Sequence, residues 1–417
     1  MKRPIAISLS PNTELDDILL SISVLLRPWI WFSKGSVKVL ENEFAAIFGD
    51  EYKAIAVNSG RSALYLILNA IGAGKGDEVC LQAFTCVAVP NSVIWNGAKP
   101  VYIDIGSNYN MDYKDLKEKL GENTRAIIVQ HTFGIPTDME NIIKIAKIKN
   151  IKIIEDCAHS LGGVYNKKKL GTFGDISFFS FGRDKVLSSV FGGIILCKDK
   201  KLYVKLSDMV NEMDNPTPFW VVQQILHPIL FYIILPLYFL GFGKVTLGKL
   251  LLVFLQKIKM LSLPIYDEEK KGIKPDVFPK KMPGGLAILA THQLQKLEKF
   301  NKIRREIAEL YFKSLKESDF SLPMKIPGAV WLRFPLRHKN ASEIVDFSRK
   351  MRVLLGNWYK GVVQPMRQLT TIGYELGSCP KAEKISTEIL NLPTYPTMNN
   401  KDARKIIEIL NSWEAIK

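Results

Sequence analysis

Cysteine is scarce in this chain, and its few occurrences form no pattern that a bridge or a metal would require. The 417 residues include 5 cysteines, an odd number. None has a second cysteine or a histidine at the spacing of a zinc site. The sequence therefore disfavours a disulfide scaffold, predicts no metal site and favours a reducing compartment. The cysteines are Cys80, Cys86, Cys157, Cys197 and Cys379.

A leader segment and a nucleic-acid-binding module are also missing. Pro11, Asp16 and Asp17 interrupt the start, so we expect no cleavable signal peptide and a cytoplasmic location. Acidic residues are the minority, since 57 Lys and Arg against 41 Asp and Glu give a net charge of +16. The lysines are scattered and form no nucleic-acid-reading module. No nucleic-acid partner is predicted, and the charge favours an anionic membrane surface.

Short runs rich in valine and isoleucine alternate with helical patterns between Ser36 and Lys198. Hydrophobic residues make up 47% of the chain and charged residues 24%, which is enough for a sizeable core. The alternation predicts an α/β domain with a mostly parallel, covered sheet. The last two runs have no long helix between them, so antiparallel pairing is expected there. The runs are 54–57, 78–81, 100–103, 126–129, 151–154, 176–181 and 193–197.

The chain divides into three regions by composition and periodicity. They are a large α/β domain over 1–213, an apolar and basic insertion over 214–272, and a long helix with a smaller C-terminal α+β domain over 273–417. The elements expected in the last region are a long helix over 286–310, a strand at 330–332 and a closing helix over 401–413.

The insertion contains a long apolar stretch, Phe219 to Leu263. Residues 219–240 are long enough to span a bilayer core of roughly 30 Å, but glutamines, a histidine and two prolines interrupt them. The second half places Lys244, Lys249, Lys257 and Lys259 among leucines, as an interfacial amphipathic helix does. We predict contact with a membrane surface; a packed insertion and a spanning hairpin are the alternatives. Residues 267–272 are predicted to be a polar linker.

Two strand ends carry polar residues that suit catalysis. The run 151–154 ends in Glu155 and Asp156, and in open α/β sheets ligands bind at the carboxyl ends of strands. The run 176–181 ends in a turn that bears Lys185, a candidate Schiff-base former if burial lowers its pKa. Each residue taken singly has an alternative: Lys185 as an ordinary surface lysine, and Asp156 as a carboxylate that caps a helix.

A third motif, Asn58 to Leu64, is a strand end, a small-residue turn and a helix start. Exposed backbone N–H groups at such a helix N-terminus bind anions, and the hydroxyls of Ser59 and Ser62 add donors. A helix cap without a ligand is the alternative.

Together these motifs resemble the DegT/DnrJ/EryC1/StrS family of pyridoxal-phosphate-dependent sugar aminotransferases. The resemblance covers nearly the whole chain and implies a fold-type-I transferase. It rests on the order and spacing of several segments: 35–41, 59–64, 76–79, 84–88, 97–101, 155–160, 171–175 and 391–396.

The resemblance implies pyridoxal 5'-phosphate as the cofactor and assigns residues to it. Lys185 corresponds to the lysine that carries the cofactor and moves the proton, and Asp156 to the carboxylate at the ring nitrogen. His159 lies beside the ring's 3'-oxygen, with a polar core histidine as the alternative. The remaining cofactor-binding residues are Ser59, Gly60, Arg61 and Ser180 around the phosphate, and Cys86, which stands where the family has a stacking aromatic ring.

Three further features depart from the family. Arg61 replaces the usual threonine of the phosphate turn, and its charge is expected to bind phosphate. Residues 279–282, Pro-Lys-Lys-Met, replace the segment that reaches the neighbouring subunit of the homodimer. The insertion is absent from typical members.

We therefore predict an aminotransferase that converts a keto-sugar to an amino-sugar with an amino acid donor such as glutamate. The keto-sugar is linked to a nucleotide or to a lipid, and the product serves surface polysaccharide or glycolipid synthesis. The enzyme is expected as a homodimer, peripheral on the inner face of the membrane through 219–263. The alternatives are a sugar dehydratase of the same family, which would lack the lysine, and a non-catalytic, membrane-docked binding protein.

Overall fold

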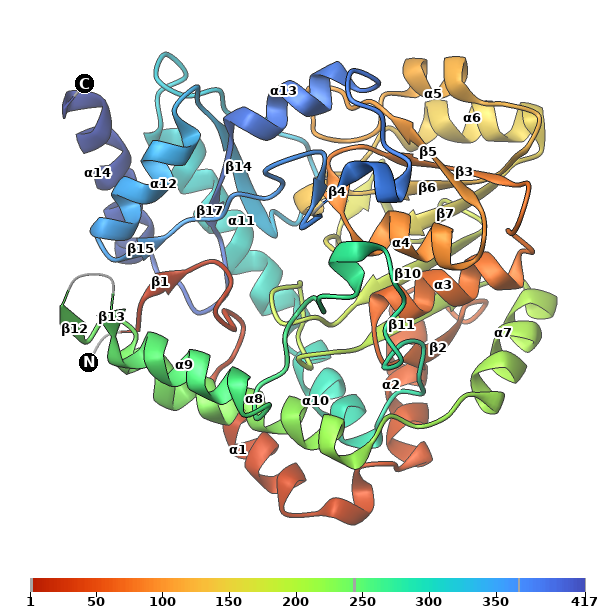
Figure 1. Cartoon of the computed structure of the whole chain (residues 1–417), viewed down its shortest axis with the longest axis horizontal. Helices are drawn as coiled ribbons and strands as arrows, with labels where there is room; N and C mark the ends of the chain where they lie inside the picture. Colours follow the sequence, from red (N-terminus) through yellow and green to blue (C-terminus); the bar gives the residue numbers. More distant parts are fainter. Residues whose placement is uncertain (1–2, 243–244, 367, 417) are drawn as a thin grey trace.

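A seven-stranded sheet forms the centre of the larger part of the molecule in the computed structural model, which describes residues 3–242, 245–366 and 368–416 (Figure 1). All neighbouring strands are parallel except β11, which is antiparallel to both β10 and β2. The predicted α/β class and the antiparallel pairing are therefore confirmed. The strand order is β2 (Lys53–Val57), β11 (Gly193–Cys197), β10 (Ile176–Ser180), β7 (Lys152–Asp156), β6 (Thr124–Gln130), β3 (Glu78–Gln82) and β5 (Lys99–Ile103).

Helices cover both faces of this sheet, because its strands are apolar on both sides. On β6, Ile128 belongs to the core shared with α3 (Gly60–Ala70), whereas Ile127 and Val129 face the core of α5 (Tyr113–Lys119) and α6 (Met139–Lys149). Other helices of this part are α1 (Leu15–Leu25), α2 (Lys34–Ala46), α4 (Ala88–Trp95) and α7 (Lys200–Glu212).

The C-terminal part packs helices against the antiparallel pair β14 (Arg333–Arg337) and β17 (Ile389–Pro393). The helix expected over 286–310 is two helices, α10 (Gly284–Leu294) and α11 (Leu297–Ser314), and the strand expected at 330–332 begins only at Arg333. Short parallel pairs join the two parts of the molecule: β1 (Ile5–Ala6) with β15 (Val353–Leu354), and β4 (Thr85–Cys86) with β16 (Val363–Gln364). The remaining helices are α12 (Ala341–Lys350), α13 (Pro380–Glu388) and α14 (Asn400–Ile416), the last as predicted.

The insertion folds as two helices, α8 (Pro218–Leu237) and α9 (Leu247–Lys257). Pro228 lies inside α8 without ending it. The length and composition of α8 would allow it to cross a membrane, but just over half of its most apolar window (56%) is buried inside the protein. The helix packs against α1, α9 and α10. Lys244, one of the four lysines in the membrane prediction, lies outside the described residues.

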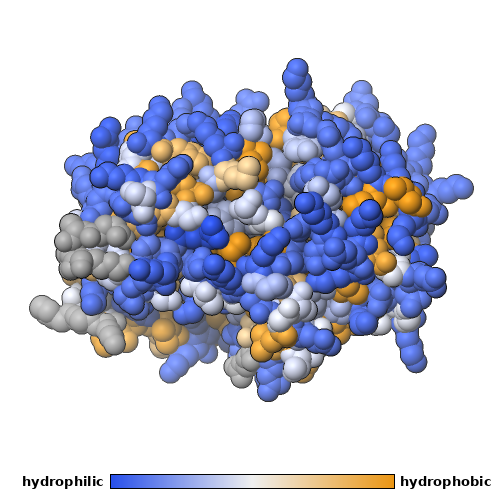
Figure 2. Space-filling model, turned by 90° about the horizontal axis from the view of Figure 1, so that it is seen from above, coloured by the Kyte–Doolittle hydropathy of each residue, from blue (hydrophilic) through white to orange (hydrophobic). Residues whose placement is uncertain are grey.

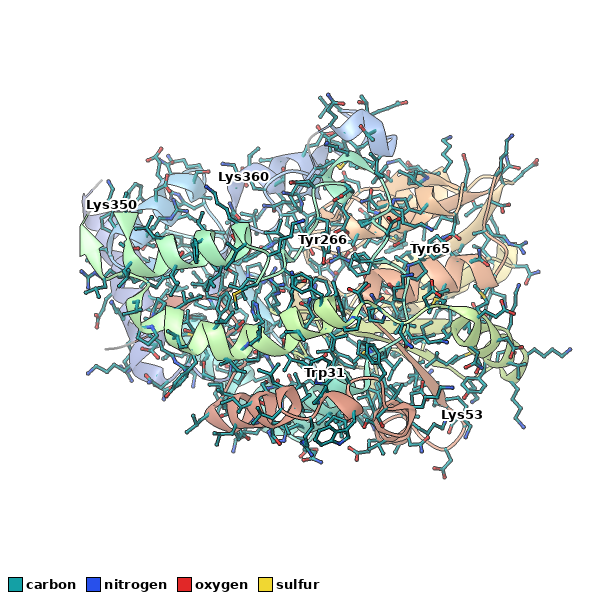
Figure 3. The ribbon with its side chains drawn as sticks, turned by 60° about the horizontal axis from the view of Figure 1, so that its bottom comes forward. Trp31, Lys53, Tyr65, Tyr266, Lys350 and Lys360 are labelled. Carbon is teal, nitrogen blue, oxygen red and sulfur yellow. The ribbon has the colours of Figure 1, made fainter. Side chains whose placement is uncertain are left out.

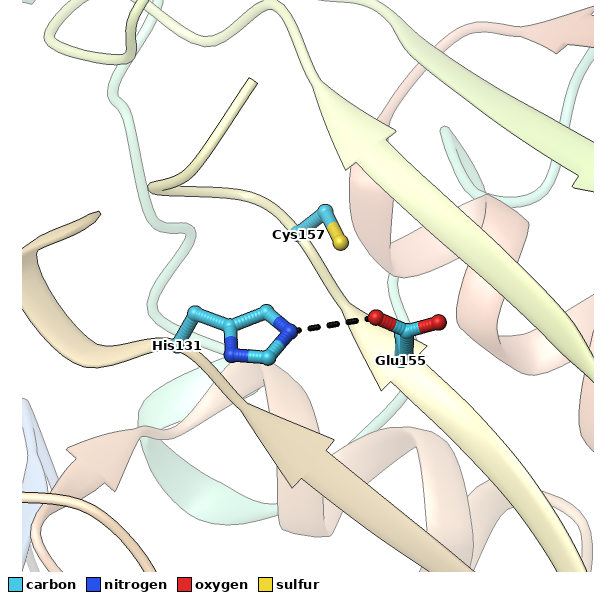
Figure 4. A group of neighbouring side chains, drawn as sticks. All are labelled: His131, Glu155 and Cys157. Atoms are coloured by element: carbon cyan, nitrogen blue, oxygen red, sulfur yellow. Dashed lines mark hydrogen bonds and ion pairs between the residues drawn. The ribbon is translucent and has the colours of Figure 1, made fainter. Parts of the chain in front are cut away.

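A buried carboxylate anchors the loop that leads into β10. Glu155, on β7, accepts hydrogen bonds from the backbone N–H groups of Gly171, Phe173 and Gly174 at 2.5–2.8 Å. His131 Nε2 lies 3.2 Å from the same carboxylate, and Cys157 is adjacent (Figure 4). His131 Nδ1 accepts the Thr137 N–H, so Nε2 carries the proton and donates to Glu155. Hydrogen bonds thus occupy both carboxylate oxygens, and the cluster is structural.

We expect Glu155→Gln to lower the free energy of unfolding by about 3 kcal/mol, because the amide nitrogen would face backbone N–H groups that have lost their acceptor. Urea denaturation measures the change. Glu118→Gln, at an exposed position of α5, is the matched control and should change stability little. Equal stability of the two variants would contradict the anchoring role.

Candidate active site

A cavity of about 400 Å³ lies at the carboxyl ends of β7 and β10. The residues that the family resemblance assigns to the cofactor all line this cavity, so the structure brings together positions that are far apart in the sequence. They are Ser59, Gly60, Arg61, Cys86, Asp156, His159, Ser180 and Lys185. Ser62 does not line it, because its hydroxyl donates to Asn58 Oδ1, and neither does Glu155.

Asp156 ends β7 and is buried between its neighbouring strands, opposite Gln130 of β6 and Phe178 of β10. Its Oδ1 accepts the Ala158 N–H at 3.0 Å. Burial raises the pKa of this carboxyl, while the Ala158 hydrogen bond acts in the opposite direction. A protonated nitrogen placed against this group would stabilise its ionised form and form a charge-assisted hydrogen bond with it.

Lys185 lies in the turn after β10, and its Nζ is 2.9 Å from His159 Nε2. His159 Nδ1 accepts the Phe133 N–H at 3.2 Å, so the ring carries its proton on Nε2. Burial lowers the pKa of His159 well below its usual value and also lowers the pKa of Lys185. With Nε2–H as the donor, the amine of Lys185 is the acceptor of this hydrogen bond, and the lowered pKa favours the neutral amine, which is the nucleophilic form of lysine.

The N-terminus of α3 supplies the anion site expected at 59–64. Ser59 caps the helix, since its Oγ accepts the Ser62 N–H at 3.1 Å, and the first N–H groups of a helix have no partner within it. Gly60 lies so close to β10 that a Cβ there would be 2.9 Å from Ser180 Cβ. This close approach brings the Ser180 hydroxyl beside the free N–H groups.

The side chain of Arg61 is directed away from the phosphate site that it is expected to bind. Its guanidinium forms an ion pair with Glu269, donates to the Pro264 carbonyl at 2.9 Å and lies 4.7 Å from the ring centre of Phe278. Glu269 is fully buried. Glu269, in the stretch predicted to be a polar linker, thus neutralises Arg61, so a phosphate at this helix N-terminus would have the backbone N–H groups and Ser180 as its donors.

Arg333 also lines the cavity, although the sequence motifs do not predict it. Arg333, at the start of β14, forms an ion pair with Asp184, and its guanidinium lies 3.6 Å from the ring centre of Trp358. Cys86 faces the same space, and burial raises the pKa of its thiol. Position 86 holds no aromatic ring, but aromatic residues line other parts of the cavity: Phe178, Phe191, Phe231, Trp358 and Tyr359.

These residues fit pyridoxal phosphate. The cavity presents the buried carboxyl group of Asp156, the amine of Lys185 with its lowered pKa, and a helix N-terminus that Gly60 allows to approach Ser180 closely. These groups suit the ring nitrogen, the aldehyde carbon and the phosphate of the cofactor. A parallel sheet with one antiparallel strand, β11, and a lysine in the turn that leads into it is the arrangement of a fold-type-I pyridoxal-phosphate enzyme.

Comparison with known proteins agrees. The chain belongs to the DegT/DnrJ/EryC1/StrS aminotransferase family, which matches residues 21–215 and 261–411 and leaves out most of the insertion. It is therefore a pyridoxal-phosphate-dependent sugar aminotransferase, as predicted.

Individual relatives cover almost the full chain. GDP-perosamine synthase of Escherichia coli O157:H7 is 27% identical over 402 residues, 93% of each protein. The dTDP-3-amino-3,6-dideoxy-alpha-D-galactopyranose transaminase of Aneurinibacillus thermoaerophilus is 28% identical over 383 residues, 91% of this chain and 90% of its own. A putative sugar aminotransferase of Streptococcus pneumoniae in its PLP form shares the fold, with a TM-score of 0.74 at 19% identity, covering 99% of this chain and 98% of its own.

The neutral state of Lys185 has a measurable pH signature. We expect the rate of covalent attachment of pyridoxal phosphate to the apoenzyme, followed by absorbance, to rise with pH and then level off. Because burial lowers the pKa of Lys185, the plateau should begin below about 10.4, the ordinary pKa of lysine. A rate that rises tenfold per pH unit up to that value would contradict a neutral amine.

Proposed function

We propose that this enzyme converts a keto-sugar, carried on a nucleotide or a lipid, to the amino-sugar, with an amino acid such as glutamate as donor. The donor's amino group and two electrons pass to the sugar, so the donor leaves as a keto acid and the sugar carbonyl carbon becomes an amine-bearing carbon. The observation that carries this proposal is the convergence of Lys185 and Asp156 on one cavity. The product would serve surface polysaccharide or glycolipid synthesis.

Each side chain has a definite task in this proposal. Pyridoxal phosphate, when bound, supplies a ring that accepts the electron pair released from the donor's α-carbon. Lys185 Nζ takes the proton from that carbon, and His159 Nε2–H orients the amine. Asp156 holds a proton on the ring nitrogen. The N–H groups at Gly60 and Arg61, together with the Ser180 hydroxyl, bind the phosphate.

Arginines give the cavity a charge that suits its anionic ligands. Arg183 and Arg333 line it, each is largely buried, and in each the Nε is without a hydrogen-bond partner among the described residues. Arg333 forms an ion pair with Asp184, whereas Arg183 donates to the uncharged Ser262. Burial lowers the pKa of Arg183 to about 10, so the group is still charged at neutral pH. Such cations suit the donor's carboxylate and a diphosphate that links a sugar to its carrier.

Two alternatives have less support. A dehydratase of this family lacks the lysine, whereas Lys185 lies in the cavity next to His159. A non-catalytic binding protein has no need of the Lys185–Asp156 arrangement. The homodimer expected from the family stays a prediction.

Lys185→Ala should abolish both the visible absorbance of lysine-bound cofactor and turnover. Borohydride reduction followed by peptide mass spectrometry should attach the cofactor to Lys185 in the wild type and to no lysine in the variant. Lys117→Ala, at an exposed position, is the control and should keep both signals. Transamination by Lys185→Ala would refute the assignment.

Asp156→Asn should lower the rate by about a hundredfold or more, which corresponds to about 3 kcal/mol in the barrier. The amide keeps the shape of the carboxylate but loses the charge that keeps the ring nitrogen protonated. Single-turnover kinetics with glutamate as donor measure the effect. A rate close to that of the wild type would remove Asp156 from this role.

A further inference from the structure

The two helices of the insertion have one face toward the cavity and another toward solvent. Their inner faces contribute His227 and Phe231 of α8 and Leu252 and Gln256 of α9 to the lining of the cavity. Apolar side chains nevertheless continue on the outside: Tyr232 and Ile233 of α8, Leu247, Leu250, Val253 and Phe254 of α9, and Ile258 beyond it are all exposed.

Helix α1 extends this outer surface. Leu15, Leu19 and Ile22 are exposed and recur at the spacing of one helix face, which continues to Leu26 after the helix. Trp29, 74% exposed, follows. Helix α1 packs against α8 and α8 against α9, and Figure 3 shows the three helices side by side when the bottom of the molecule comes forward. We call this surface the apolar face.

The helices of the insertion carry only positive charges on the apolar face. Residues 215–266 contain no Asp or Glu, whereas Asp16 and Asp17 in the first turn of α1 form ion pairs with Lys296. Lys257 and Lys259 are exposed at the end of α9. The opposite side of the molecule, seen from above in Figure 2, is mainly hydrophilic with separate small apolar patches. An extended apolar surface with exposed lysines at one end suits helices that lie in a membrane interface.

A second copy of the chain is a poorer occupant of this face. In a two-fold interface the same patch contacts itself, and the insertion supplies no Asp or Glu that could pair with Lys257 and Lys259 of the other copy. Anionic lipid supplies the missing negative charge and accepts the apolar side chains as well.

We propose that the apolar face docks the enzyme on an anionic membrane surface, with α8 and α9 lying along it rather than crossing it. The burial of α8 within the protein requires this orientation. The active-site cavity then lies directly behind the docked helices. If the aminotransferase function proposed above holds, this position favours a sugar attached to a membrane lipid as substrate.

Flotation of the full-length holoenzyme tests the docking. The wild type should float with vesicles of equal parts phosphatidylcholine and phosphatidylglycerol and should float much less with phosphatidylcholine alone. Leu250→Glu/Phe254→Glu should stay at the bottom. The matched control, Ile148→Glu/Leu376→Glu, makes the same change at exposed apolar positions elsewhere and should float. Retained cofactor absorbance reports that each variant is folded.

Charge is tested separately. Lys257→Gln/Lys259→Gln should weaken binding to the anionic vesicles about fivefold for each lysine, without loss of cofactor. Two results would overturn the proposal. One is flotation of Leu250→Glu/Phe254→Glu equal to that of the wild type. The other is a wild type that does not float but sediments as a dimer that this variant converts to a monomer, which would assign the face to a second copy. Flotation needs no turnover, so its failure leaves the proposed reaction untouched.

Discussion

Three backbone segments are in close contact at Gly60, Ser180 and Gly193, and the active site depends on this contact. A Cβ on Gly60 would lie 2.9 Å from Ser180 Cβ, and one on Gly193 would lie 2.4 Å from the Ser59 carbonyl carbon. The contact fixes the N-terminus of α3 against the end of β10. The helix N–H groups and the turn that carries Lys185 therefore open into the same cavity. The Glu155 carboxylate, both of whose oxygens accept hydrogen bonds, stabilises this arrangement from the other end of β10.

Two departures from the family pattern, the arginine at position 61 and the insertion, are structurally linked. Arg61 stands where the family has threonine, and it forms an ion pair with Glu269 in the segment that returns from the insertion. Arg183 donates to Ser262, which in turn donates to Gln224 of α8. Buried, charge-assisted bonds of this kind attach the insertion to the cavity wall. The arginine thus follows from the presence of the insertion, and the phosphate site relies on the backbone instead.

The sequence alone predicts the parts of the fold that local patterns encode. Each strand of the sheet has its own run of apolar residues, and the residues assigned to the cofactor from Ser59 to Lys185 all line the cavity. The break at 295–296 between α10 and α11 was missed because the apolar periodicity continues through it. The sequence predicts that Glu269 belongs to a polar linker, because its charged neighbours indicate a segment exposed to solvent. Its burial depends on Arg61, 208 positions away in the sequence, and no local pattern reports such a partner.

The protonation state of the candidate catalytic lysine follows from backbone geometry remote from it. Phe133 has a positive φ of 57°, which is rare for a bulky residue, and this conformation aims its N–H at His159 Nδ1. The N–H fixes the histidine tautomer, and the tautomer leaves Lys185 as an acceptor rather than a donor. A cationic lysine would bring two N–H donors face to face in a buried site. The backbone conformation at Phe133 thus favours the acceptor role of the Lys185 amine, in the same direction as its lowered pKa.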